Sequence, residues 1–161
     1  MKLERIVSGG QTGADRGGLD AAIDLGLEHG GFCPKGRRAE DGAVPARYRL
    51  VETASADYAV RTRKNVDASD ATVVFTRGAP TGGSALTAAY AKERGRPLLL
   101  VDLATTSARR AQSLVRRFLV ESGARTLNVA GTRESGAPGI ADEVRRIVRL
   151  SAAPRATRRA R

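Results

Sequence analysis

Apolar and amphipathic segments alternate along most of the chain. Short apolar runs, rich in leucine and β-branched residues as in strands buried on both faces of a sheet, occupy residues 3–8, 71–75, 97–101 and 125–129. Apolar positions at helical spacing predict helices over residues 14–25, 57–68, 106–121 and 140–150, and one that ends near residue 94. This alternation predicts a mostly parallel sheet with helices on both of its faces.

The beginning of the chain has the order of a βαβ unit, with a strand, a glycine turn and then a helix from residue 14. We therefore predict a single α/β domain of Rossmann-like build over residues 1–150. In its first helix, Leu19, Ala22 and Ile23 share the face expected to pack on the sheet. Residues 30–49, rich in glycine, proline and charge, are predicted to form a long functional loop, followed by a short strand at residues 50–52.

Three connections from a strand to a helix carry glycines, at residues 8–13, 77–84 and 130–139. In a parallel sheet such connections meet at the carboxyl edge, where glycine N–H groups and the positive ends of helices hold anions. We predict that a small anionic, phosphate-bearing ligand binds there. The candidate binding residues of the first two connections are Gly9, Gly10, Gln11, Thr12, Gly13, Thr81, Gly82, Gly83 and Ser84. The alternative is that these glycines only form turns and permit close packing.

The first glycine turn, GGQTG at residues 9–13, fits neither standard nucleotide pattern. It lacks the spacing of the dinucleotide fingerprint G-x-G-x-x-G, and it has no lysine after the last glycine as a P-loop requires. An ATPase and an ordinary NAD-dependent dehydrogenase are therefore disfavoured.

The loop at residues 33–42 places three cations ahead of two acids. Lys35 and Arg37 would clamp an anion over the first glycine turn, or the segment is a solvated surface loop. Cys33 is either a reactive thiol or metal ligand, or a small buried hydrophobe. His29 is the only histidine, which excludes a site of several histidines, and we expect it to be exposed.

Several long motifs resemble the putative molybdenum carrier family, which is related to the molybdenum cofactor carrier proteins of algae and bacteria. They are SGGQTGADR at residues 8–16, CPKGRRAEDG at 33–42, RT at 61–62 with NV at 65–66, GG at 82–83 and NVAG at 128–131. The resemblance spans about residues 5–150. It implies a Rossmann-like fold shared with lysine-decarboxylase-like phosphoribohydrolases, homo-oligomers such as dimers or tetramers, and binding of molybdenum cofactor, molybdate or a related phosphate ligand.

The resemblance adds Arg61, Asn65 and Arg133 to the candidate binding residues. Arg133 and its neighbour Glu134 either reach the ligand or pair with each other across their loop. No metal ligand is assigned from the chain, because a carrier holds the cofactor without covalent chemistry.

An enzyme is the main alternative. The phosphoribohydrolases carry a P-G-G-x-G-T-x-x-E motif, whose glutamate helps to cleave the N-glycosidic bond of a nucleoside monophosphate. Residues 80–89 keep the glycines but have no glutamate, and Glu93 lies about two helical turns away. Asp15 would replace it, or would only stabilise the first helix turn. The sequence thus favours a carrier with no catalytic residue, and nucleotide binding or a phosphoribohydrolase-like reaction stays open.

Basic charge is concentrated in the last third of the chain. Residues 1–103 have 15 Lys and Arg against 13 Asp and Glu, whereas residues 104–161 have 13 Arg against 4 acids. We interpret residues 151–161 as a basic disordered tail, with either weak, non-specific contact to nucleic acid or no partner. Aromatic residues make up only 4% of the chain, which disfavours a nucleic-acid-binding module.

With one cysteine, no signal-peptide pattern and no apolar run near the ~20 residues that a membrane helix needs, we predict a soluble cytoplasmic protein.

Overall fold

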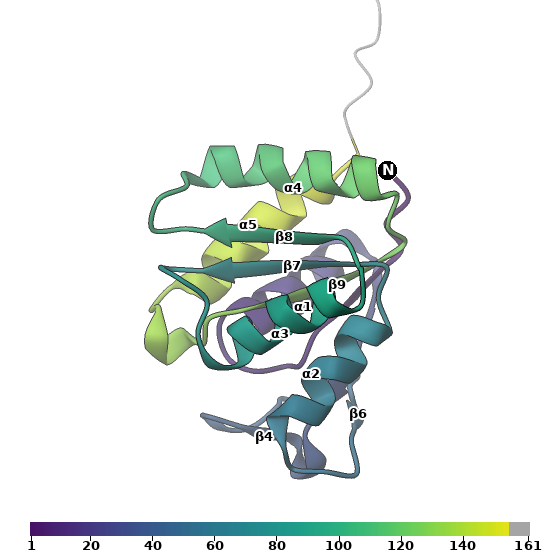
Figure 1. Ribbon diagram of the computed structural model, residues 1–161, viewed down its shortest axis with the longest axis vertical. Coiled ribbons are helices and arrows are strands. Elements are labelled where there is room, and N and C mark those ends of the chain that lie inside the picture. Colours follow the sequence, from purple (N-terminus) through teal and green to yellow (C-terminus); the bar gives the residue numbers. More distant parts are fainter. Residues whose placement is uncertain (155–161) are drawn as a thin grey trace, which may run out of the picture.

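A parallel sheet lies at the centre of the computed structural model, which describes residues 1–154 (Figure 1). Its five strands have the order β2-β1-β9-β7-β8, and every neighbouring pair is parallel. Their bounds are β1 Arg5–Val7, β2 Glu28–Gly30, β7 Ala71–Thr76, β8 Leu98–Asp102 and β9 Thr126–Gly131. The prediction of a Rossmann-like α/β domain is confirmed.

Five helices cover this sheet. They are α1 (Ala14–Leu25), α2 (Tyr58–Asp67), α3 (Gly82–Glu93), α4 (Ala108–Ser122) and α5 (Ile140–Ala152). α1, α4 and α5 share one core with the sheet, while α2 and α3 pack together on the opposite face (Figure 1). β7 is buried at all six positions because helices cover both of its faces, which explains why its sequence, ATVVFT, contains no charged residue and is rich in β-branched ones.

Polar caps fix where the helices begin. Asp57 accepts the N–H of Ala59 (2.9 Å) at the start of α2, and Ser107 accepts that of Arg110 (3.1 Å) at the start of α4. Glu134 accepts N–H groups of Gly139 and Ala141 at the start of α5. The carboxylate of Glu134 therefore caps the start of α5, and within residues 1–154 it forms no ion pair with Arg133.

Residues 30–49 are not the continuous loop that we predicted. They contain β3 (Phe32–Cys33), a 3₁₀ turn at Lys35–Arg37 and an antiparallel hairpin of β4 (Arg38–Ala39) and β5 (Gly42–Ala43). β3 pairs with β6 (Val51–Glu52), the short strand that we predicted. Strands of two residues are too short to produce a periodic pattern, so the sequence shows only their turn residues.

Three other expectations need correction. Ile23 lies on the outer side of α1 and is 45% exposed. Gly82 and Gly83 form the first turn of α3 and not a turn ahead of it. His29 lies half-buried in β2, where its Nε2 accepts the N–H of Arg49 (3.2 Å).

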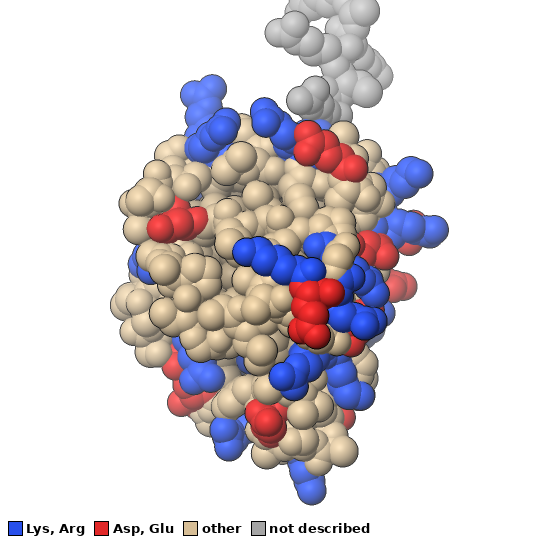
Figure 2. All heavy atoms as spheres, viewed as in Figure 1, with Lys and Arg blue, Asp and Glu red and all other residues tan. Residues whose placement is uncertain are grey.

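The end of the chain is helical for longer than we predicted. α5 includes Ser151 and Ala152, and the buried Ser151 hydroxyl donates to the carbonyl of Ile147 (2.6 Å). Residues 155–161, the rest of the predicted basic tail, lie outside the described residues. Between residues 1 and 154, no helix has the length and apolar character needed to cross a membrane. Figure 2 shows basic side chains interspersed with acidic ones on one face of the molecule.

Candidate functional site

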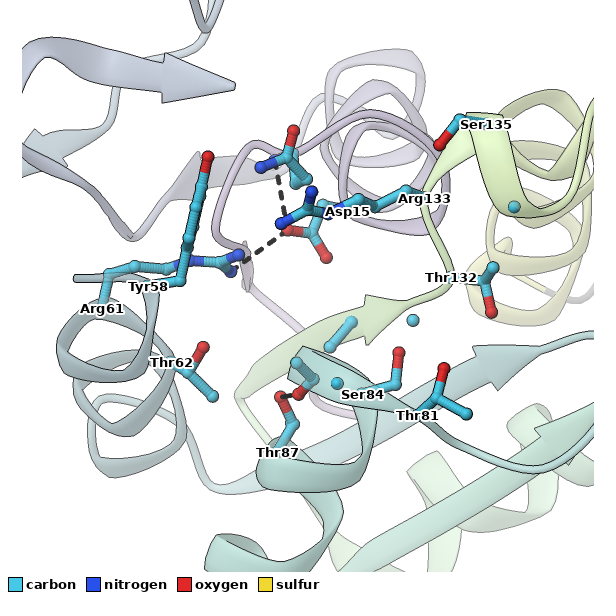
Figure 3. Close-up of a pocket in the computed structure, with 16 residues that line it drawn as sticks. Asp15, Tyr58, Arg61, Thr62, Thr81, Ser84, Thr87, Thr132, Arg133 and Ser135 are labelled. Carbon is cyan, nitrogen blue, oxygen red and sulfur yellow. Dashed lines mark hydrogen bonds and ion pairs between the residues drawn. The ribbon is translucent and has the colours of Figure 1, made fainter. Parts of the chain in front are cut away.

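A pocket of about 400 Å³ lies where the three glycine-containing connections meet (Figure 3). Its walls come from the segments around Gln11, Ser84 and Arg133, which the sequence analysis had placed at one sheet edge. α2 supplies the remaining wall. The predicted residues that line this pocket are Gln11, Asp15, Arg61, Thr81, Gly82, Gly83, Ser84 and Arg133.

The first turn of α3 offers unused hydrogen-bond donors to the pocket. The N–H groups of Ser84 and Ala85 both bond the carbonyl of Thr81 (3.1 and 3.3 Å), but within residues 1–154 those of Gly82 and Gly83 bond no protein acceptor. Both glycines are exposed and have open space beside them, with no atom within 4 Å of where a Cβ would lie. The Thr81 side chain makes no cap. This helix end can therefore receive an acceptor, and its dipole favours an anion.

Arg61 is a buried cation on the opposite wall. Its side chain is only 11% exposed, and its Nη1 lies 3.4 Å from Oδ2 of Asp15. Its Nε is fully buried and has no hydrogen-bond partner within the described part of the chain. An unsatisfied buried donor costs free energy, so this side chain is suited to an acceptor that enters the pocket.

Asp15 approaches Arg61 from the start of α1 (Figure 3). Its Oδ2 also accepts the N–H of Gln11 (3.2 Å). Burial raises the pKa of Asp15, and the positive charge of Arg61 opposes that rise. The predicted position of Asp15 in this cleft is correct, and its side chain does more than stabilise a helix start.

A stack of guanidinium groups and a phenol borders the pocket. Arg133 reaches toward Tyr58 (Figure 3), and its guanidinium carbon lies 5.0 Å from the ring centroid. That of Arg38 lies 4.6 Å from the same centroid, and its Nε donates to the phenol oxygen (3.1 Å). Burial acts to raise the pKa of Tyr58, but the hydrogen bonds from Arg38 and Gln11 and the nearby charges outweigh it and lower this pKa.

Three N–H groups of the first glycine turn, those of Gly10, Gln11 and Thr12, are bonded within the protein, contrary to our expectation that this turn presents them to a ligand. The N–H of Gly10 bonds Ser8 Oγ (3.2 Å) and that of Thr12 bonds the side-chain oxygen of Gln11 (3.3 Å). Those of Gln11 and Ala14 bond Asp15 Oδ2 (3.2 Å) and the carbonyl of Thr132 (3.1 Å).

The glycines of this turn permit close packing instead. A Cβ at Gly9 would overlap the guanidinium group of Arg61, and one at Gly10 would lie 2.5 Å from Leu50. A Cβ at Gly13 would lie 2.6 Å from the backbone nitrogen of Glu134. For these three positions, the alternative interpretation of the glycines is the one that the structure supports.

Four further candidates lie outside the pocket. Arg37 donates to the carbonyls of Val44, Pro45, Tyr48 and Leu50 at 2.8–3.4 Å, so its guanidinium group holds its own loop together and does not line the pocket. Lys35 is exposed in the 3₁₀ turn. Asn65 exchanges two hydrogen bonds with the backbone of Phe32 (2.8 and 3.0 Å), and the Thr12 hydroxyl donates to Glu40.

The sequence analysis placed the connection at residues 130–139 at this edge but named only Arg133 from it as a candidate. The lining residues that it did not name are Tyr58, Thr62, Thr87, Ala130, Gly131, Thr132, Ser135 and Gly136. Tyr58 and Thr62 belong to α2, which follows a two-residue strand outside the main sheet. The rule that ligands bind at the carboxyl ends of the strands of a parallel sheet therefore did not indicate them. Thr87 lies one turn into α3, and its helical spacing from Gly83 was the available signal.

Cys33 is fully buried in a small core with Leu19, Val44 and Tyr48, and burial raises the pKa of its thiol. This environment fits the small buried hydrophobe and not the reactive thiol. Among the described residues, no three His, Cys, Asp or Glu side chains gather closely enough to hold a metal ion.

Comparison with known proteins gives two matches. The model of the circularly permutated YpsA SLOG family matches residues 6–151. A crystal structure from Syntrophus aciditrophicus SB, named "putative molybdenum carrier protein", is 41% identical, with a TM-score of 0.91 over 94% of this chain and 96% of that chain. No curated protein matches. The family match spans most of the chain and its whole pocket, and the chain belongs to the circularly permutated YpsA SLOG family.

Proposed function

We propose that this chain binds a small phosphate-bearing anion non-covalently in the pocket between α2, α3 and the loop after β9, and that it acts as a carrier for molybdenum cofactor. The observation that carries the proposal is the state of Arg61. This buried cation has an Nε without an acceptor, and it lines the same pocket as the free N–H groups of Gly82 and Gly83. A phosphate supplies several strong acceptors for these donors.

Molybdenum cofactor has the chemistry that such a pocket requires. It is a pterin with a terminal phosphate and an oxyanion-like metal centre, and here it is cargo. A volume of about 400 Å³ lies within the range of roughly 300–1,000 Å³ typical of small-molecule sites. The name of the Syntrophus protein supports this cargo. Because residues 1–154 contain no cluster of metal-ligating side chains, the proposed contacts are to the phosphate and the ring.

The cargo is tested by native mass spectrometry of the protein purified from its own cells, together with molybdenum analysis. We expect an added mass that contains phosphorus and molybdenum. If the bound cargo contains phosphorus but no molybdenum, the proposed anion site would stand and molybdenum cofactor would be excluded as its ligand. A protein with no phosphorylated cargo, in cells that make the cofactor, would count against the carrier.

The anion site is tested by calorimetry with inorganic phosphate on two variants of one residue. Gly83→Pro removes a single N–H from the first turn of α3, where proline is tolerated, and Gly83→Ala keeps that N–H in the same open space. We expect Gly83→Pro to weaken phosphate binding about tenfold and Gly83→Ala to leave it nearly unchanged. Equal phosphate affinities for the two variants would show that the N–H groups at the start of α3 do not bind the phosphate.

A phosphoribohydrolase-like reaction is the second candidate, because one observation favours it. The carboxyl group of Asp15 lies in the pocket with a pKa raised by burial, as a general acid requires. The carrier proposal predicts that no free base is released from nucleoside monophosphates. Release of base that is abolished by Asp15→Asn would favour the enzyme.

A further inference from the structure

The two carboxylate oxygens of Asp15 have different surroundings. Oδ2 accepts the N–H of Gln11 and lies 3.4 Å from Nη1 of Arg61. Oδ1 takes part in no hydrogen bond within residues 1–154, and in Figure 3 it points away from the dashed contacts into the pocket. The Asp15 side chain is only 6% exposed, so it has little access to solvent acceptors and donors. Oδ1 is therefore a hydrogen-bond acceptor that faces the pocket and has no donor among the described residues.

A phosphate group does not supply such a donor. The dianionic phosphate of a monoester presents only acceptors, as a carboxylate does, and the two repel each other at short distance. The N–H groups of Gly82 and Gly83 lie on the α3 wall, whereas Asp15 lies at the start of α1 beside Arg61, which holds its Oδ2. A phosphate at the first turn of α3 therefore leaves Oδ1 of Asp15 free to accept a hydrogen bond from another part of the ligand.

We propose that Asp15 selects the ligand: Oδ1 accepts a hydrogen bond from a hydroxyl or N–H group of a phosphate monoester whose phosphate lies at the first turn of α3. This inference rests on the proposed function and narrows its ligand class. The ligand carries both a phosphate and a donor, on a sugar or on a nitrogen-containing ring. A phosphate ester without a donor satisfies only one end of the pocket, and inorganic phosphate bound at the first turn of α3 has no further group that extends to Asp15.

The electrostatics of Asp15 agree with this role. Burial raises its pKa, and Arg61 opposes the rise. A donor at Oδ1 stabilises the ionised carboxylate in the same way as the N–H of Gln11 does at Oδ2, so ligand binding offsets part of the effect of burial.

Asp15→Asn tests the selection, because it reverses the polarity of one atom. The amide oxygen of asparagine takes the place of Oδ2, where Gln11 and Arg61 present donors, so the NH₂ group replaces Oδ1 in the pocket. We expect Asp15→Asn to bind ribose 5-phosphate or guanosine 5′-monophosphate at least about tenfold more weakly than wild type in calorimetry. Its affinity for inorganic phosphate should stay equal or rise, because a negative charge has left the pocket.

Methyl phosphate, which has no donor, should bind wild type no better than inorganic phosphate does. Ribose 5-phosphate and 2′,3′-dideoxyguanosine 5′-monophosphate separate the two sources of the donor, since the first has only sugar hydroxyls and the second has a donor-bearing ring. Asp24→Asn is the matched control, because it removes the same charge from an exposed pair with Arg145 (2.7 Å) and should change none of these affinities.

Two results would overturn the inference. If wild type binds methyl phosphate as tightly as the donor-bearing esters, the pocket does not recognise a hydrogen-bond donor on the ligand. An equal loss of inorganic phosphate and esters in Asp15→Asn shows that Asp15 only shapes the anion site. Failure of wild type to bind any phosphate compound is a different result, which would overturn the proposed anion site and this inference with it.

Discussion

Arg61 and Asp15 form an ion pair that is buried on both sides, with Nη1 and Oδ2 3.4 Å apart and side-chain exposures of 11% and 6%. The pair joins α2 to α1 and lies in the wall of the pocket. At this separation it does not satisfy Arg61, whose Nε still has no acceptor. The pair therefore positions a cation and an acceptor for a ligand more than it contributes stability.

The pH dependence of stability tests the burial of Asp15. The pKa of Asp15 is raised in the folded state from an ordinary value of 3.8, so the folded protein keeps a proton that the unfolded chain has released. The stabilising contribution of this group is complete below that ordinary value and is lost as the pH rises through the folded pKa. Asp15→Asn does not titrate, so its free energy of unfolding should increase relative to wild type as the pH rises. Urea unfolding of both proteins between about pH 4 and pH 8 measures this difference, and a constant difference would contradict the prediction.

Arg37 should be a structural residue and not a ligand-binding one. Its guanidinium group bonds four backbone carbonyls, and a lysine ammonium cannot reach all of them from one position. We expect Arg37→Lys to lower the free energy of unfolding by about 2 kcal/mol, because several partly buried carbonyls lose their donors at once. Its affinity for inorganic phosphate should equal that of wild type in calorimetry.

Lys35→Ala is the comparison for Arg37→Lys. Lys35 is exposed and lies outside the pocket, so this variant should change neither stability nor phosphate affinity. A large loss of phosphate affinity in either variant would support the hypothesis from the sequence that Lys35 and Arg37 bind the anion.

The sequence predicts four of the five strands of the main sheet and all five helices because most of these elements have regular patterns. The buried β-branched run of β7 and the apolar stripe of α4 at Ala111, Val115 and Leu119 are examples. β2 and β3 are three and two residues long, and neither gives a pattern that separates it from a loop. Their positions depend on pairing with β1 and β6, which a single sequence does not show.

The site is predictable on one side only. Topology brings α3 and the loop after β9 to one edge, so Ser84 and Arg133 follow from the sequence. α2 reaches the pocket through tertiary packing, and Arg61 was found by family resemblance alone. The misassigned N–H groups of the first turn have a similar cause. Asp15 turns back onto Gln11 beside Arg61, a residue 46 positions away, and no local pattern reports that contact.

Glu40 should fasten the β4–β5 hairpin to the wall of the pocket. Its carboxylate accepts the hydroxyl groups of Thr12 and Ser135, the latter at 2.6 Å, and its own N–H bonds Gln11 (2.8 Å). The hydrogen bond from Ser135, with that from Thr12, lowers the pKa of Glu40 below 4.5, so this contribution to stability is present at neutral pH and is lost as the pH falls through the folded pKa.

We expect Glu40→Ala to lower the free energy of unfolding by about 1 kcal/mol and to speed amide hydrogen exchange in the hairpin. Hydrogen exchange followed by mass spectrometry locates the effect, and Glu93→Ala on the exposed end of α3 is the control. Unchanged exchange in residues 38–43 would show that the hairpin is held by other contacts.

The close approach of the first glycine turn to the loop after β9 should make Gly13 the most sensitive glycine of this region. Gly13 has a φ of +83°, and an added Cβ would lie 2.6 Å from the nitrogen of Glu134 and 2.7 Å from the carbonyl carbon of Arg133. Gly36 has a similar φ of +78° but open space around it. Gly36→Ala should therefore cost only the left-handed backbone, about 1 kcal/mol, while Gly13→Ala should cost about 2–4 kcal/mol because backbone must also move. Thermal and urea unfolding of the two variants isolate the packing contribution, and equal losses would show that the two loops are not in contact at Gly13.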